Sequence, residues 1–164
     1  MTGRKLAAVL LLLLAAGCGV QPTGAVPAGE APSIPDNRLV VKTPGDATLY
    51  FLVRGGLYGS SRSLSGQTGV DAALNALLSG PDARESAAGM VTLLPRVTGP
   101  VKVWGSDVLT IQVPFAIKGL PELALSQLVC TAVTVTRYSS AGGALNGVNL
   151  GGTDGPPGYR ECHP

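Results

Sequence analysis

The longest unbroken apolar run of the chain stands near its start. Leu6 to Ala16 are all apolar, Arg4 and Lys5 precede them, and Gly17-Cys18 follows. A positive start, an apolar segment and small residues in this order are typical of an export signal. As a helix the run would rise only about 16 Å, too short for a hydrocarbon core of roughly 30 Å. The pattern predicts a signal peptide over residues 1–17 rather than a transmembrane anchor.

The cysteine after this run decides which kind of export signal we predict. An ordinary secretory signal needs no thiol, whereas the sulfur of Cys18 can be alkylated by a lipid donor before cleavage. Leu14 to Cys18 resembles a lipobox, with Leu14 one position further out than is usual. We expect diacylglyceryl on Cys18 and attachment to the extracytoplasmic face of the cell membrane. The alternative is a secreted protein with a chance cysteine near the cut.

Proline and glycine punctuate residues 18–45. The prolines of this segment are Pro22, Pro27, Pro32, Pro35 and Pro44. Such a composition predicts a semi-extended tether that reaches about 30 Å as a coil and about 80 Å as polyproline. A short β-forming run at 39–41 leaves open an ordered extension near Val40.

Alternating and helical hydrophobic periods predict the elements that follow, beginning at Asp46. Thr48 to Val53 and Leu57 to Leu64 read as strands joined by a glycine turn. A helix begins at Val70, with Thr68 and Asp71 as a capping box, and ends at Gly80-Pro81. Asp82 to Ala88 adds a turn or two.

The second half of the domain repeats the order of two strands followed by a helix. Val101 to Trp104 and Val108 to Val113 form a hairpin, and a second helix begins at Pro121. We expect its β-branched end, Val133 to Thr136, to fray or turn extended, and a last strand near Val148 to Leu150. The order β-β-α-β-β-α-β over residues 46–151 predicts an α+β domain, a mostly antiparallel sheet with two helices on one face.

Two cysteines remain once Cys18 carries lipid. Cys130 lies on the second predicted helix, and Cys162 lies in a Gly/Pro-rich tail over residues 152–164. Thiols outside the cytoplasm tend to pair, so we predict a disulfide that staples the tail. The alternative is a buried free Cys130 with an unpaired, flexible Cys162.

Charge and chemistry narrow the function classes. Twelve basic and ten acidic residues give a net charge of +2. Loss of Arg4 and Lys5 with the signal leaves ten of each and a neutral mature chain, unlike a nucleic-acid binder. The single histidine, His163, stands next to last, and no metal-ligand spacing is present. We therefore predict no enzyme, no metal and no cofactor.

The acidic residues fit structural positions, and a few others could form a recognition face. Asp71, Asp82 and Glu122 read as helix-start residues, and Asp107 as part of a hairpin turn. The candidates for recognition are Trp104, Tyr50, Tyr58 and Arg62. For Trp104 a core position is favoured over an interface.

Three stretches together resemble the GerMN domain of sporulation and spore germination proteins. They are Leu49 to Val53, the helix from Val70 to Pro81 with Ala87-Ala88-Gly89 and Leu94-Pro95 after it, and Val108 to Val113. Leu125 to Thr131 is similar to that family's Ala-Gln-Leu-Val stretch. The resemblance implies a non-catalytic module of envelope assemblies or sensor systems, with no catalytic residues to carry over. The Gly/Asn-rich stretch 144–150 departs from the family pattern.

The predicted lipid anchor, the tether and the compact domain together indicate an envelope-facing lipoprotein. Its partners would be the membrane, through the lipid, and an envelope protein or peptidoglycan. Sporulation and envelope signalling are the processes that the resemblance suggests. A small-ligand carrier serving a transporter and an enzyme acting on envelope polymers are the alternatives.

Overall fold

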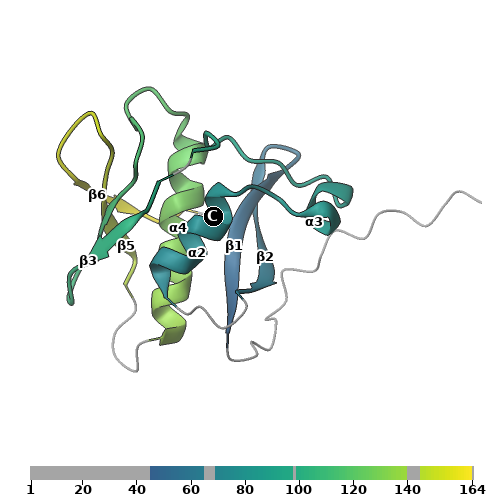
Figure 1. The fold of residues 1–164 in the computed structure, drawn as a ribbon, viewed down its shortest axis with the longest axis horizontal. Helices are drawn as coiled ribbons and strands as arrows, with labels where there is room; N and C mark the ends of the chain where they lie inside the picture. The colour runs from purple at the N-terminus through teal and green to yellow at the C-terminus, as the bar shows by residue number, and fades with distance from the viewer. Residues whose placement is uncertain (1–44, 65–68, 98, 140–144, 164) are drawn as a thin grey trace, which may run out of the picture. The chain divides into compact units, whose positions relative to one another are not determined.

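The computed structural model describes residues 45–64, 69–97, 99–139 and 145–163. The signal, Cys18 and the tether, except for Gly45, lie outside the described residues. The elements are β1 (Asp46–Val53), β2 (Gly56–Ser63), α2 (Val70–Leu78), α3 (Ala83–Ala87), β3 (Lys102–Trp104), β4 (Thr110–Gln112), α4 (Glu122–Ser139), β5 (Gly147–Gly151) and β6 (Gly158–Glu161). The predicted α+β class is confirmed (Figure 1).

The first hairpin is closed by a two-residue turn. Val53 pairs with Gly56, and the residues between them, Arg54 and Gly55, have φ values of 51° and 84°. Two positive φ values in succession give the turn whose twist matches that of the strands. The hairpin thereby keeps the register that buries Leu49 and Phe51 completely.

The strands form two sheets rather than the single sheet predicted. The antiparallel pair β1-β2 is one, and β3-β4-β5-β6 is the other, in which β4 and β5 run parallel. Helices α2 and α4 lie between the sheets, and α4 packs against both β1 and β5 (Figure 1). Every residue of α4 from Ala124 to Val133 is buried, as expected for a helix covered on more than one side.

Helix α4 continues past the point where we expected it to fray. Its β-branched end stays helical to Ser139, which corrects the prediction for residues 133–136. Val133 and Val135 are buried, and the Thr136 hydroxyl donates to the Ala132 carbonyl oxygen at 2.8 Å. Tertiary burial therefore outweighs the weak helix propensity of these residues.

Two buried polar side chains of α4 complete the hydrogen bonding of β1. The Tyr50 backbone N–H donates to the Thr131 hydroxyl at 3.0 Å, and the Gln127 amide donates to the Tyr50 carbonyl oxygen at 2.9 Å. The Gln127 amide oxygen also accepts from the Leu93 backbone N–H at 3.0 Å. Both side chains are fully buried, so these bonds satisfy groups that water does not reach. They account for the two completely buried polar side chains, Gln127 and Thr131, within the stretch 125–131.

The C-terminal segment belongs to the domain. Its strand β6 pairs with β5 at the edge of the larger sheet, so the domain does not end at residue 151. Cys130 of α4 and Cys162 form a disulfide with an S–S distance of 2.10 Å. Cys162 also donates its backbone N–H to the Asn146 carbonyl oxygen. The predicted pair thus fastens an ordered edge strand rather than a loose tail.

The helix starts differ in how they are capped. Gly69 is the N-cap of α2 and provides no side-chain hydrogen bond, while Thr68 lies outside the described residues. At α3 the Asp82 carboxylate accepts from the Glu85 backbone N–H, and the Glu85 carboxylate accepts from the Asp82 N–H. Asp82 is therefore the helix-start residue that the sequence predicts, within a complete capping box.

Candidate functional site

The larger sheet has one face packed on helices and one face that no described element covers (Figure 1). Ile111, Val148 and Leu150 point to the helices and are almost completely buried. Because side chains alternate along a strand, their neighbours point the other way. We call this second side the open face, and its side chains are Lys102, Trp104, Thr110, Gln112, Asn149, Tyr159 and Glu161.

Four of these side chains form a row across the sheet. Trp104 pairs with Thr110, Thr110 with Asn149, and Asn149 with Tyr159. The rings at the two ends are well exposed, Trp104 at 50 % and Tyr159 at 55 %. The core position favoured for Trp104 is therefore wrong, because Val103 takes the inward position on this strand.

Glycine keeps the open face flat beside this row. A Cβ at Gly147 would lie 2.8 Å from Cζ and 2.9 Å from the hydroxyl oxygen of Tyr159, so the tyrosine ring lies over this glycine. A Cβ at Gly151 would lie 2.7 Å from the Gln112 amide oxygen. The Gln112 amide donates in turn to the Gly152 carbonyl oxygen. The ring and the amide thus rest against the backbone.

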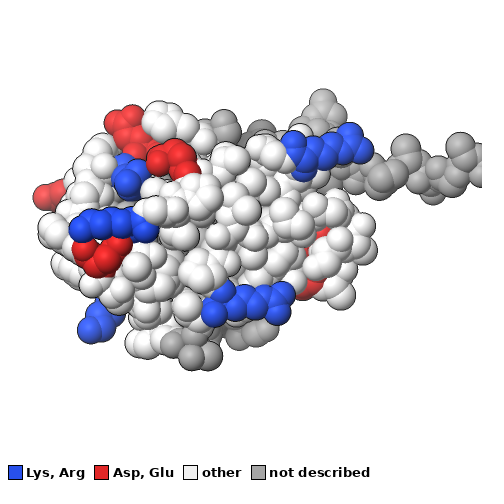
Figure 2. All heavy atoms as spheres, turned by 90° about the horizontal axis from the view of Figure 1, so that it is seen from above, with Lys and Arg blue, Asp and Glu red and all other residues white. Residues whose placement is uncertain are grey.

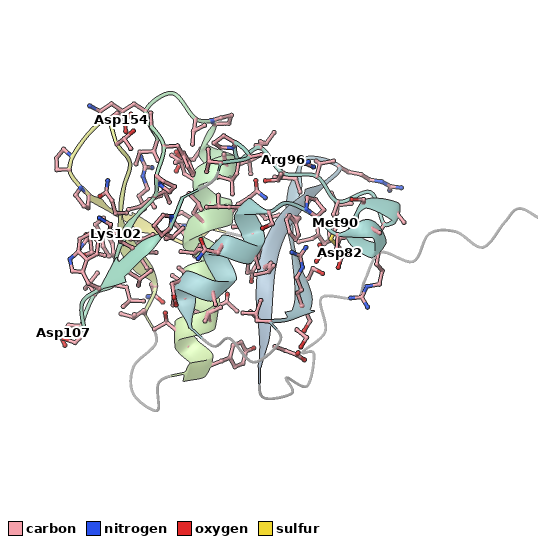
Figure 3. All side chains as sticks on the ribbon, viewed as in Figure 1. Asp82, Met90, Arg96, Lys102, Asp107 and Asp154 are labelled. Atoms are coloured by element: carbon pink, nitrogen blue, oxygen red, sulfur yellow. A yellow bond between two sulfur atoms is a disulfide. The ribbon has the colours of Figure 1, made fainter. Side chains whose placement is uncertain are left out.

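Charges lie at the margins of the open face. Lys102 is on the edge strand β3, and Glu161 is near the end of the opposite edge strand β6. Figure 3 shows Lys102 on β3 and Asp107 at the tip of the β3–β4 turn. His163 lies 3.9 Å from Glu161, between imidazole Nε2 and carboxylate oxygen. The aligned row itself contains uncharged groups only.

The other predicted recognition residues have structural roles. Arg62 donates to the carbonyl oxygens of Ala76 and Gly80 and to the carboxylate of Glu85, which is only 2 % exposed. Its guanidinium also lies 5.5 Å from the centre of the Phe51 ring. Arg62 therefore ties β2 to the turn between α2 and α3.

The two remaining tyrosine candidates are partly buried. Tyr58 packs against the core, and the Tyr50 hydroxyl lies 3.4 Å from the hydroxyl of Thr134. A Cβ at Gly59 would approach the Tyr50 ring to 3.7 Å, so this ring rests on the hairpin. Neither side chain is as exposed as that of Trp104.

Two carboxylates have lowered pKa values through hydrogen bonds to the backbone. The Glu85 N–H, aided by the charge of Arg62, lowers the pKa of Asp82. The Ile117 and Lys118 N–H groups lower the pKa of Asp154. Both carboxylates are thus held ionised as local structural acceptors, the opposite of the raised pKa that a general acid needs.

A shallow hollow lies beside the loop between β5 and β6. Ile117, Lys118, Asp154 and Arg160 help to line this hollow of about 180 Å³, whereas ligand pockets generally enclose about 300–1,000 Å³. Among the described residues no group of three or more His, Cys, Asp or Glu is placed to hold a metal. No helix in this part of the chain is long and apolar enough to cross a membrane.

Charge does not gather into one basic patch on the face seen in Figure 2, where Lys and Arg side chains lie scattered over a mainly uncharged surface.

Searches against protein-family models, curated proteins and solved structures found no match to this chain.

Sequence reasoning named Trp104 but missed Asn149 and Tyr159 as its neighbours. The predicted disulfide contains a signal that places Tyr159 on the open face. If Cys162 must face helix α4, alternation places Arg160 inward as well and Tyr159 outward. Arg160 does point to the helix side, where it pairs with Glu122 at 3.2 Å.

Proposed function

We propose that this protein is a lipid-anchored, envelope-facing, non-catalytic binding module. Diacylglyceryl on Cys18 would hold it to the outer face of the cell membrane, and the open face would contact an envelope protein or the cell wall. The observation that carries this proposal is the order of a positive start, an apolar run and Gly17-Cys18. The GerMN resemblance supports a place in sporulation or envelope signalling.

The physics of lipid anchoring supports the placement at the membrane. Each buried CH₂ contributes about 0.8 kcal/mol, so two acyl chains hold a protein where one binds only reversibly. Residues 18–45 then act as the spacer that carries the domain away from the bilayer.

The carboxylates of the domain support a non-catalytic role. Glu85, the most buried of them, is paired with Arg62 and the backbone of Asp82. Asp154 is committed to the backbone of residues 117 and 118. The open face, by contrast, combines exposed rings with uncharged hydrogen-bonding groups, a composition suited to binding.

Replacing Cys18 by serine tests the anchor. Cells fed an alkyne-bearing fatty acid are expected to label the natural protein and not Cys18→Ser, since serine lacks the nucleophilic thiol. Membrane retention after a high-salt wash should fall with the label. Thr23→Ser, a change of similar size in the tether, should behave as the natural protein does. Equal labelling of Cys18→Ser and the natural protein would refute lipid attachment at this residue.

A further inference from the structure

The open face has the chemistry of a platform for carbohydrate. Exposed aromatic rings stand at both ends of the aligned row, and a hydroxyl and an amide lie between them. An aromatic ring offers a flat apolar face, and the C–H-bearing side of a sugar ring is its natural partner. Hydroxyl and amide groups can each donate and accept, as the hydroxyls of a sugar do.

The dimensions of the row suit an extended chain rather than a single small molecule. The backbone positions of Trp104 and Tyr159 are separated by three strand spacings of roughly 4.8 Å, about 14 Å in all. The tyrosine ring lies down over Gly147 instead of standing away from the sheet. A ligand that spans both rings must therefore be long and flat.

The distribution of charge on the open face favours an uncharged ligand. Binding to a polyanion is dominated by Lys and Arg, and Lys102 is the one basic side chain of the open face. Glu161 offsets that charge at the other edge. The row between them contains no ionisable group that a charged peptide could pair with, apart from the phenol of Tyr159.

We propose that the open face binds an uncharged glycan chain, the carbohydrate part of the cell wall, along the row from Trp104 to Tyr159. The two rings stack on sugar rings, and Thr110 and Asn149 hydrogen-bond to the hydroxyl and acetamido groups between. This assignment rests on the proposed function, since it names the ligand of that same surface.

Trp104 is the only tryptophan of the chain, so its fluorescence reports directly on the proposed site. The full-length protein, in a detergent without a sugar head group, is titrated with chitotetraose, an uncharged tetramer of N-acetylglucosamine. We expect a saturable change in emission. Tyr159→Ala should weaken binding about tenfold or more, as for an interface hot spot. Asn149→Ala should weaken it less.

Tyr138→Ala is the matched control, because Tyr138 is an exposed tyrosine of α4, 60 % accessible and away from the open face. It should bind chitotetraose as the natural protein does, and all variants should show the same unfolding midpoint to within a few degrees. Absence of saturable binding, or equal binding by Tyr159→Ala, would overturn the glycan assignment. So would capture of a protein or of polyphosphate at Trp104 in place of the sugar. The labelling of Cys18 tests the anchor separately, so the two failures are distinguishable.

Discussion

Replacing Arg62 by alanine is expected to lower the free energy of unfolding by about 3–5 kcal/mol, the usual cost of breaking a buried ion pair from one side. The change strands the carboxylate of Glu85, which is 2 % exposed and has lost its cationic partner. It also removes the donors to the carbonyl oxygens of Ala76 and Gly80. The turn that joins α2 to α3 should loosen first.

Urea unfolding followed by circular dichroism measures this effect, with Arg160→Ala as the matched control. Arg160 pairs with Glu122 at 3.2 Å, but both side chains are exposed, so its loss should cost no more than about 1 kcal/mol. The double variant Arg62→Met with Glu85→Leu should be more stable than Arg62→Ala, because it leaves no buried charge unpaired. Equal stability of Arg62→Ala and Arg160→Ala would contradict the structural role given to Arg62.

Replacing Cys162 by alanine is expected to cost about 3–4 kcal/mol. The disulfide closes a loop between residues 32 apart in sequence, and opening it returns that loop's entropy to the unfolded chain. Cys162 is the better residue to change because Cys130 is completely buried and remains as a small apolar side chain. The backbone amides of strand β6, at the sheet edge, should lose most of their protection against hydrogen exchange.

Denaturant unfolding with and without reductant separates the cross-link from the side chain. The reduced natural protein and Cys162→Ala should unfold at nearly the same denaturant concentration, below that of the oxidised natural protein. Amide hydrogen exchange should quicken in β6 well before it does in β1. A reductant that leaves the natural protein unchanged would mean that the cross-link contributes nothing to stability.

Local patterns predicted most elements of the domain. The glycines after Arg54 indicate the first hairpin, and Gly80, whose φ is 84°, ends α2 as the sequence predicts. These features depend on residues close together in the chain, so a short window contains the whole cause. The same holds for Asp82, whose role depends on Glu85 three residues later.

Pairing between distant strands could not be predicted in the same way. Alternation along β4 and β5 indicates which side each residue faces, yet it does not say that the two strands are neighbours or that they run parallel. The division into two sheets depends on α4 being buried on several sides. Gln127 and Thr131 are polar, and they indicate a buried side of this helix only once their hydrogen-bond partner, the backbone of Tyr50, is known.

The candidate site was predictable in part. Trp104 could be named from composition, but its exposure follows from Val103 taking the inward position. The alignment of Trp104 with Tyr159 joins residues 55 positions apart across four strands. No local pattern contains that alignment, although the predicted pairing of Cys130 with Cys162 constrains it.

The most direct test of the account is the intact mass of the protein extracted from membranes. We expect a chain that begins at Cys18, gains the mass of a diacylglyceryl group, with or without a third acyl chain, and lacks the two hydrogen atoms lost in forming the Cys130–Cys162 disulfide. A chain that begins at another residue without added lipid, or that retains residues 1–17, would contradict the anchor on which the proposed function depends.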